Sequence, residues 1–249
     1  GSTQTVTLKI VEAYRIKLLQ EAGAPGGDGT SLIVDIEEAA FMDLGRNGQP
    51  QILLSGNDVV EIPDTLGPTL VKADLFFSNN TLVVYGDETI DVSKLSFLNV
   101  SSFFLGNTSQ TNDVSLHGAI GKVSKALTFE VQLTAIQIGK AIKLSTVYDY
   151  SPLVLNVFAN ATQDLAGNLN NAQHGITIIE YPDTRRPLIT GATVDYSDSL
   201  LLISSDEILD GMRPQLSNVT KFVIAKTSGN AFSDGRVEIR LTGSTMVSG

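Results

Sequence analysis

Two acidic clusters are the side chains of this 249-residue chain with the clearest capacity for chemistry. They comprise Asp87, Glu88 and Asp91 in the first cluster and Asp206, Glu207 and Asp210 in the second. Carboxylate oxygens are the ligands that Ca²⁺ prefers, although each cluster supplies only part of the roughly 6–8 oxygens that the ion needs. The spacing therefore predicts either a calcium site that stiffens a domain junction or a solvated strand end rich in turn-forming Asp.

Five Asn-x-Ser/Thr sequons are the second chemical signal, at Asn79, Asn99, Asn107, Asn160 and Asn218. In a eukaryotic secreted protein such sequons accept N-glycans on exposed loops. Asn99 and Asn218 fall at the same position of an internal repeat that is set out below. For a chain of that origin we expect at least one occupied sequon, which would make the protein a glycoprotein.

The composition and motifs of the chain give little support for an enzyme. The chain has no Cys and two His, and it contains no Gly-x-Ser-x-Gly nucleophile elbow. The Gly-rich segment 23–29 lacks the Lys-Ser/Thr pair of a phosphate-binding loop and is expected to be a loop insertion. A net charge of −10 disfavours nucleic-acid partners, and no apolar run reaches the ~18 residues of a membrane span. We therefore predict a protein that is not an enzyme and has no nucleic-acid or membrane-inserted function.

The sequence pattern predicts that β-strands position the acidic clusters and the sequons. Apolar and polar residues alternate over 6–10, 127–133 and 237–241, as in strands with one buried face. Six shorter apolar runs also fit strands, namely Leu32–Ile36, Leu82–Tyr85, Leu153–Phe158, Ile176–Ile179, Leu200–Ile203 and Lys221–Ala225. Two stretches fit short helices without clear caps, Val11–Gln20 and Ile136–Leu144. The pattern predicts an all-β sandwich or barrel.

An internal repeat sets the expected domain map. The segment Pro63–Pro68 (P-D-T-L-G-P) returns as Pro182–Pro187 (P-D-T-R-R-P), after about 119 residues. About 15 of about 47 positions are identical without a gap, where chance gives roughly 3. A second pair of motifs, Asp43–Asn47 (D-L-G-R-N) and Asp164–Asn168 (D-L-A-G-N), repeats with similar spacing. The chain is therefore expected to contain about two domains of ordinary size.

The repeat boundaries divide the chain unevenly. Residues 64–182 are expected to form one complete repeat, residues 1–63 the C-terminal half of a repeat, and residues 183–249 the N-terminal half of another. Because a half-sandwich would expose an apolar face and open strand edges, each half needs a complement. We expect a neighbouring copy or the continuing chain to supply it, which implies a head-to-tail array. An arbitrary cut within a domain is the alternative.

Three motifs of the complete repeat carry a family resemblance. They are the opening Asp64-Thr65-x-x-Pro68, the acidic Asp87-Glu88-x-Ile90-Asp91 and the closing Asp164–Asn168. In these motifs the chain resembles the bacterial Ig-like domains of S-layer and large surface proteins, with relatives in algal and protist surface proteins. It departs from them where Gly86-Asp87 replaces the usual Phe-Ser and Gly45-Arg46 replaces Ala-Gly. The resemblance implies tandem Ig-like Greek-key β-sandwiches, an extracellular location and no enzyme activity.

Two classes of function fit this reading. The first is a structural module of an extracellular filament, appendage or surface layer, in which Ig-like domains stack end to end. The second is a cell-surface adhesin that binds its ligand with loops at the sandwich ends. A regular array with completed half-domains would favour the first, and a monomer with a specific glycan or protein ligand would favour the second.

Overall fold

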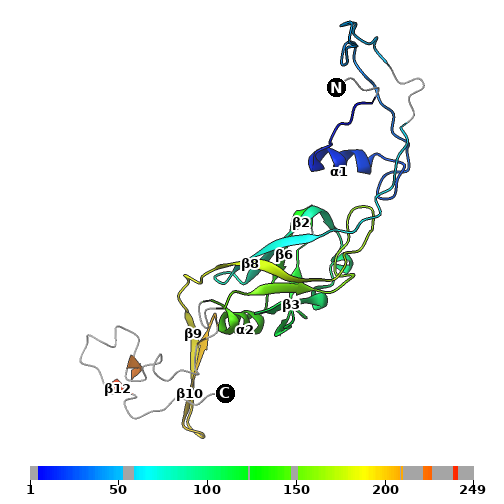
Figure 1. The fold of residues 1–249 in the computed structure, drawn as a ribbon. Helices are drawn as coiled ribbons and strands as arrows, with labels where there is room; N and C mark the ends of the chain where they lie inside the picture. Colours follow the sequence, from blue (N-terminus) through cyan, green and yellow to red (C-terminus); the bar gives the residue numbers. More distant parts are fainter. Residues whose placement is uncertain are drawn as a thin grey trace. The chain divides into compact units, whose positions relative to one another are not determined.

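The chain divides into two compact units, Gly1–Thr184 and Arg185–Gly249. The computed structural model describes residues 5–52, 59–122, 124–146, 151–207, 209, 221–225 and 238–240 (Figure 1). Asn218 and Asp210 lie outside these residues, as does most of the segment that follows residue 207. Within the described residues the structure is rich in strands, so the expected β-class is confirmed at that level.

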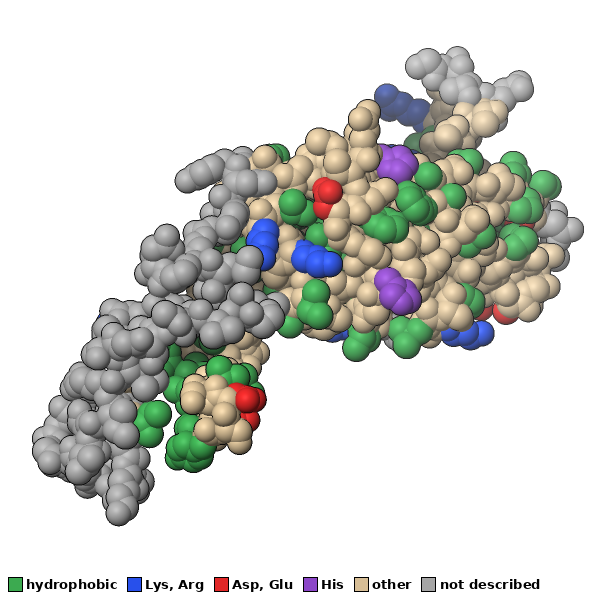
Figure 2. Space-filling view, turned by 90° about the horizontal axis from the view of Figure 1, so that it is seen from below, with side chains coloured by type: hydrophobic (Ala, Val, Ile, Leu, Met, Phe, Trp, Pro, Cys, Tyr) green, Lys and Arg blue, Asp and Glu red, His purple; other side chains and the backbone are tan. Residues whose placement is uncertain are grey.

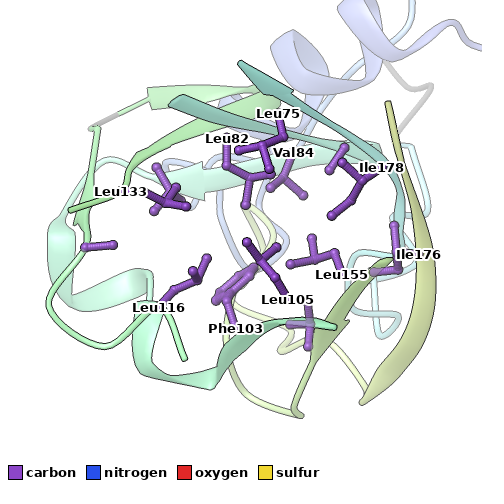
Figure 3. Close-up of a cluster of buried hydrophobic side chains, with 14 of the residues drawn as sticks. Leu75, Leu82, Val84, Phe103, Leu105, Leu116, Leu133, Leu155, Ile176 and Ile178 are labelled. Carbon is purple, nitrogen blue, oxygen red and sulfur yellow. The ribbon is translucent and has the colours of Figure 1, made fainter. Parts of the chain in front are cut away.

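Eight strands of the first unit form one mixed sheet in the order β4-β3-β7-β8-β1-β2-β6-β5. Neighbours are antiparallel except β1 and β8, which run parallel. We call this sheet the curled sheet, because Figure 3 shows it wrapping around one apolar interior. Its strands are β1 (Leu70–Phe76), β2 (Thr81–Val92), β3 (Phe103–Gly106), β4 (Val114–Ser115), β5 (Ile120–Gly121), β6 (Ser124–Gln132), β7 (Val154–Val157) and β8 (Gln173–Tyr181).

The interior of the curled sheet is filled by side chains from both of its curled sides (Figure 3). Leu75, Leu82 and Val84 of β1 and β2 point toward Phe103 and Leu105 of β3, and all five are fully buried. Alternation along each strand sends every second residue inward, so one strand contributes several core side chains. Burial of each large apolar side chain contributes about 1.5–3 kcal/mol, which makes this core the main source of stability.

Helix α2 (Ala135–Leu144) closes one end of the interior and begins with a capping box. The Gln137 amide nitrogen donates to Thr134 Oγ1 at 3.3 Å, and the Thr134 amide donates to Gln137 Oε1 at 2.8 Å. The Gln137 side-chain amide also donates to the carbonyl oxygens of Ser115 and His117, which fixes the helix beside β4. The expectation that this helix has no clear cap is wrong, because Thr134 and Gln137 form the Thr-x-x-Gln capping box.

The remaining elements lie outside the curled sheet. Helix α1 (Glu12–Gln20) has no side-chain cap and no buried residue. Two single-turn 3₁₀ helices, Leu95–Phe97 and Val100–Ser102, lead into β3. In the second unit, β9 (Ile189–Asp195) pairs with β10 (Leu200–Ser205), and β11 (Val223–Ala225) pairs with β12 (Glu238–Arg240), both antiparallel.

Two of the expected strands are not formed. Residues 6–10 belong to no strand, and Leu32–Ile36 contributes isolated bridge residues, among them Ile36, which is paired with Ile52. Both segments have a strand-like sequence pattern, but a strand is defined by backbone pairing with a neighbour. The other predicted strand segments pair, because each has an adjacent strand within its own unit.

Several local geometries occur twice along the chain. The turn at Asp43–Asn47 and the turn at Asp164–Asn168 share the same bonds: the Asn amide donates to the first Asp oxygen (2.8 and 2.7 Å), and the Asn side chain donates to the second (2.9 Å in both). About 119 residues apart, Asp87 and Asp206 each accept a backbone amide at 2.8 Å, from Thr69 and Leu188. Positive φ also recurs at this spacing, at Asn80 (58°) and Ser199 (56°).

Candidate functional site

The candidate site is a group of three carboxylates at one end of the curled sheet, Asp64, Glu88 and Asp164. One oxygen from each lies within 4.8 Å of the others. Asp64 precedes β1, Glu88 lies in β2, and Asp164 begins the turn that follows β7. Each residue comes from a different one of the three motifs noted in the sequence, so folding brings these motifs together.

Asp164 is buried and held by its own turn. Its carboxylate oxygens accept the backbone amide and the side-chain amide of Asn168, at 2.7 and 2.9 Å. The tight turn requires a positive φ of 89° at Gly167, a conformation that glycine adopts without strain. The Asn168 side chain also donates to the backbone carbonyl of Asp64 at 3.1 Å. The closing motif is thereby tied to the opening motif.

Arg15 of α1 supplies the positive charge of the site. Its guanidinium forms two bonds to Glu12, at 2.6 and 2.9 Å, and single bonds to Asp64 at 3.1 Å and Glu88 at 2.8 Å. Glu12 in turn accepts the backbone amide of Thr89 at 2.9 Å. Arg15 and Glu12 therefore join the N-terminal segment to β2 through charge-assisted bonds, which are stronger than neutral ones. We call these five residues, Glu12, Arg15, Asp64, Glu88 and Asp164, the junction cluster.

The pKa values of Glu12 and Glu88 are shifted in opposite directions, because Arg15 makes two bonds to Glu12 and one to Glu88. The bonds from Arg15 lower the pKa of Glu12 to about 2. Burial raises the pKa of Glu88 to about 7, because the single bond from Arg15 does not offset desolvation and repulsion from Asp64 and Asp164. Glu12 thus stabilises the fold above its ordinary value of 4.5 and loses that effect toward pH 2. The contribution of Glu88 instead falls as the pH rises from 4.5 to about 7.

The expected metal ligands are brought together only in part. Glu88 joins the junction cluster, but Asp87 accepts the amide of Thr69, which precedes β1, and Asp91 accepts the amide of Ser93, two residues further on. Asp206 accepts the Leu188 amide and forms an ion pair with Arg185. Glu207 is half-buried, and its amide donates to Ser205 Oγ. Among the described residues, the group that could hold a metal ion is Asp64, Glu88 and Asp164, which the sequence analysis did not predict.

The sequons occupy different environments. Asn79, Asn99 and Asn160 are exposed, whereas Asn107 is half-buried beside Thr111. The Asn99 side-chain amide donates to Ser102 Oγ at 2.9 Å within its own sequon turn. Exposed sequons are the ones that a glycosyltransferase can reach, so Asn79, Asn99 and Asn160 are the better acceptor positions.

The histidines and the Gly-rich segment show no catalytic arrangement among the described residues. His117 and His174 are both exposed and form separate surface patches in Figure 2. His117 Nδ1 lies 2.9 Å from Ser101 Oγ, and no carboxylate is recorded as its partner within the described part of the chain. In the Gly-rich segment, Gly26 packs so closely on Leu165 that an added Cβ would lie 2.5 Å from its carbonyl oxygen. That segment therefore contacts the Asp164–Asn168 turn of the site.

Comparisons of the whole chain with protein-family models, with curated proteins and with solved structures gave no match. The residues of the site therefore have to be interpreted from their own geometry.

Sequence analysis identified one of the five junction residues, Glu88, as a candidate ligand. Asp64 and Asp164 were interpreted as parts of turn motifs, and Glu12 and Arg15 as residues of a short helix. The available signal was that each of the three motifs begins with, or contains, an acidic residue. A fold that brings the three motifs together also brings their acidic residues together. Adjacent carboxylates repel one another, so they need a nearby cation.

Proposed function

We propose that this chain is a structural module of an extracellular filament, appendage or surface layer, built from end-to-end Ig-like domains. The observation that carries the proposal is the junction cluster. It joins an N-terminal segment, through Arg15 and Glu12, to the acidic residues of the next repeat. A contact of this kind between successive repeats limits their bending, which is what a stalk or filament requires.

The repeated geometries support the same organisation. Matched turns at Asp43 and Asp164, and matched backbone bonds at Asp87 and Asp206, agree with the division into residues 1–63, 64–182 and 183–249. We propose that each complete repeat is an Ig-like Greek-key sandwich, for which the curled sheet around one core is the example. In this reading the neighbouring copy or the continuing chain completes the two end segments.

Replacing Arg15 with Gln tests the junction. The substitution removes the cation that the carboxylates of Glu12, Asp64 and Glu88 share, and the remaining repulsion should release Glu12 from the Thr89 amide. Hydrogen exchange of the Thr89 amide should accelerate by about tenfold, which corresponds to about 1.4 kcal/mol of local opening. Lys17→Gln is the matched control, because Lys17 lies on the same helix and carries the same charge outside the junction cluster. Equal protection of Thr89 in all three proteins would contradict a junction that limits bending.

Calcium remains a specific proposal for the junction cluster. Asp64, Glu88 and Asp164 can offer oxygen ligands to Ca²⁺, with Arg15 as the competing cation. We expect Arg15→Gln to bind Ca²⁺ more tightly than the native chain, because the competing guanidinium is gone. Isothermal titration with CaCl₂ should give heat and a raised melting temperature for the variant. Asp164→Asn in the same background is the control, and heat that persists in it would place the ion elsewhere.

The surface chemistry fits an extracellular role. Exposed sequons at Asn79, Asn99 and Asn160 would carry N-glycans, and intact mass measured on protein from a eukaryotic secretory host tests their occupancy. Helices long and apolar enough to span a bilayer are absent from the described residues. We propose neither enzyme activity nor nucleic-acid binding. A ligand-binding adhesin is the alternative function, and it would be favoured by a monomer that binds a defined glycan or protein through loops at the sheet ends.

A further inference from the structure

Three of the five sequons have a Phe two residues before the Asn, namely Phe77-x-Asn79, Phe97-x-Asn99 and Phe158-x-Asn160. The face of an aromatic ring carries partial negative charge and attracts C–H groups, such as those on one face of a sugar ring. Two residues of chain span at most about 7 Å, so each of these rings lies within reach of a sugar attached to its Asn. Burial in the folded chain decides which ring a sugar can cover.

Phe158 is the ring among these three that remains exposed, at 41% of its surface. Phe77 lies in the core of the curled sheet and is 2% exposed, so its ring cannot meet a sugar. Phe97 is half-buried, and Lys94 Nζ already lies over its ring, 5.3 Å from the centroid. The same sequence motif therefore offers a free aromatic face at Phe158 alone.

Phe158 belongs to an aromatic surface formed by β3, β7 and β8. It directly follows β7, and its ring centroid lies 4.9 Å from that of Phe104 in β3 and 6.2 Å from that of His174 in β8. Its backbone amide donates to the carbonyl of Ser102 at 2.9 Å. These contacts hold the ring in place, so a sugar that covers it loses little entropy in ordering it. Asn160 is exposed in the turn that follows, where its φ is 62°.

The hydroxyl group that completes this sequon belongs to Thr162, which is 0% exposed. Within the described part of the chain its Oγ1 has no hydrogen-bond partner, although an unpaired buried hydroxyl is costly. The hydroxyls of the other two sequons have partners in the fold: Thr81 Oγ1 donates to Gln132, and Ser101 Oγ lies 2.9 Å from His117 Nδ1. A hydroxyl at this position is required by an N-glycosylation sequon, which accounts for a Thr where Val would fill the same space.

We propose that Asn160 carries an N-glycan whose first N-acetylglucosamine stacks on the Phe158 ring and so becomes part of the structure of the curled sheet. In the transfer, Asn160 Nδ2 loses a proton and bonds to C1 of the sugar, while the bond from C1 to the pyrophosphate of a lipid-linked oligosaccharide breaks. The transfer precedes folding, because Thr162 is accessible only until it is buried. The inference rests on the proposed extracellular function and specifies which sequon carries a glycan that supports the fold.

Melting temperatures of the full chain, produced in a eukaryotic secretory host and in bacteria, test the stacking. Thr162→Val removes this glycan and costs the fold no hydrogen bond that the described residues show. We expect it to lower the melting temperature of the secreted protein by about 3 °C and to leave that of the bacterial protein, which carries no N-glycan, unchanged. In a Phe158→Leu background the same substitution should have no effect in either host, because the ring is gone.

Ser101→Ala is the matched control, because it removes the sequon of Asn99. It also removes the contact with His117, so it can lower the melting temperature by itself. That change should be the same in both hosts, since Lys94 already covers the Phe97 ring and leaves no face for a sugar.

Proton NMR of the secreted protein gives a direct measurement of the stacking. The ring current of Phe158 should shift protons of the first N-acetylglucosamine on Asn160 upfield. In Phe158→Leu these protons should return to the positions of an unstacked sugar.

Three outcomes would overturn the stacking: glycopeptide mass spectrometry that finds Asn160 unmodified in the secreted protein, a Thr162→Val effect that is equal in both hosts or persists in Phe158→Leu, or sugar protons without an upfield shift. Failure here is distinguishable from failure of the proposed function. Protection of the Thr89 amide is measured on the bacterial protein and does not depend on a glycan. A protected Thr89 together with an unmodified Asn160 would leave the tandem array standing and exclude the stacked glycan. Cooperative unfolding verifies that each variant is folded.

Discussion

Replacing Asp164 with Ala should lower the free energy of unfolding of the curled sheet by about 2–3 kcal/mol. The buried carboxylate accepts two amide groups of Asn168, and its loss leaves both without a charged acceptor. Asn168 would then also release the Asp64 carbonyl, so the opening and closing motifs would separate. The substitution also removes the repulsion between Asp164 and Glu88, which offsets part of the lost stability. We therefore expect the free energy of unfolding to fall by no more than this amount. Urea denaturation measures the difference.

Asp43→Ala is the matched control for this substitution. The Asp43 turn has the same two bonds to Asn47, but it is exposed, so water can replace the carboxylate. The midpoint of urea unfolding should not change. If the two variants were equally destabilised, the turn bonds alone would matter, and the position of Asp164 in the junction cluster would contribute nothing.

Asn170→Ala should have the largest effect of any polar substitution we consider, about 3–4 kcal/mol. The buried side-chain oxygen accepts the amides of Ala161 and Thr162 at 2.7 and 2.8 Å. Its nitrogen donates to the carbonyls of Phe158 and Asn171 at 3.1 and 2.7 Å. Alanine would leave four backbone groups without this partner, and the amides of Ala161 and Thr162 are buried, where an unsatisfied donor is costly.

Gln49→Ala tests whether burial causes this cost. Gln49 makes the corresponding bonds in the N-terminal segment, from the Phe41 amide at 2.6 Å and to the Glu37 carbonyl. Its surroundings are exposed, so we expect thermal unfolding of the curled sheet to be unchanged.

Much of the fold could be predicted from local sequence. The alternating pattern of residues 127–133 and the apolar run at 200–203 lie in β6 and β10, because the period of side-chain direction in a strand is fixed. Helix α2 was also predictable, and its capping box at Thr134 and Gln137 could have been recognised from four residues. Residues 6–10 have an equally clear pattern but form no strand, because pairing depends on a partner that local sequence does not supply.

The sequence by itself determined the β-rich class, the two occurrences of each motif and the acidic surface, because these depend on composition and on spacing along the chain. Only the tertiary structure decided the membership of the junction cluster. Asp64, Glu88 and Asp164 are far apart in the sequence. They meet because β1 begins beside β2 where Leu70 pairs with Gly86, and because Asp164 forms a bridge with Ile90 of β2. Arg15 joins them because three adjacent carboxylates need a cation, and this requirement arises only once the chain has folded.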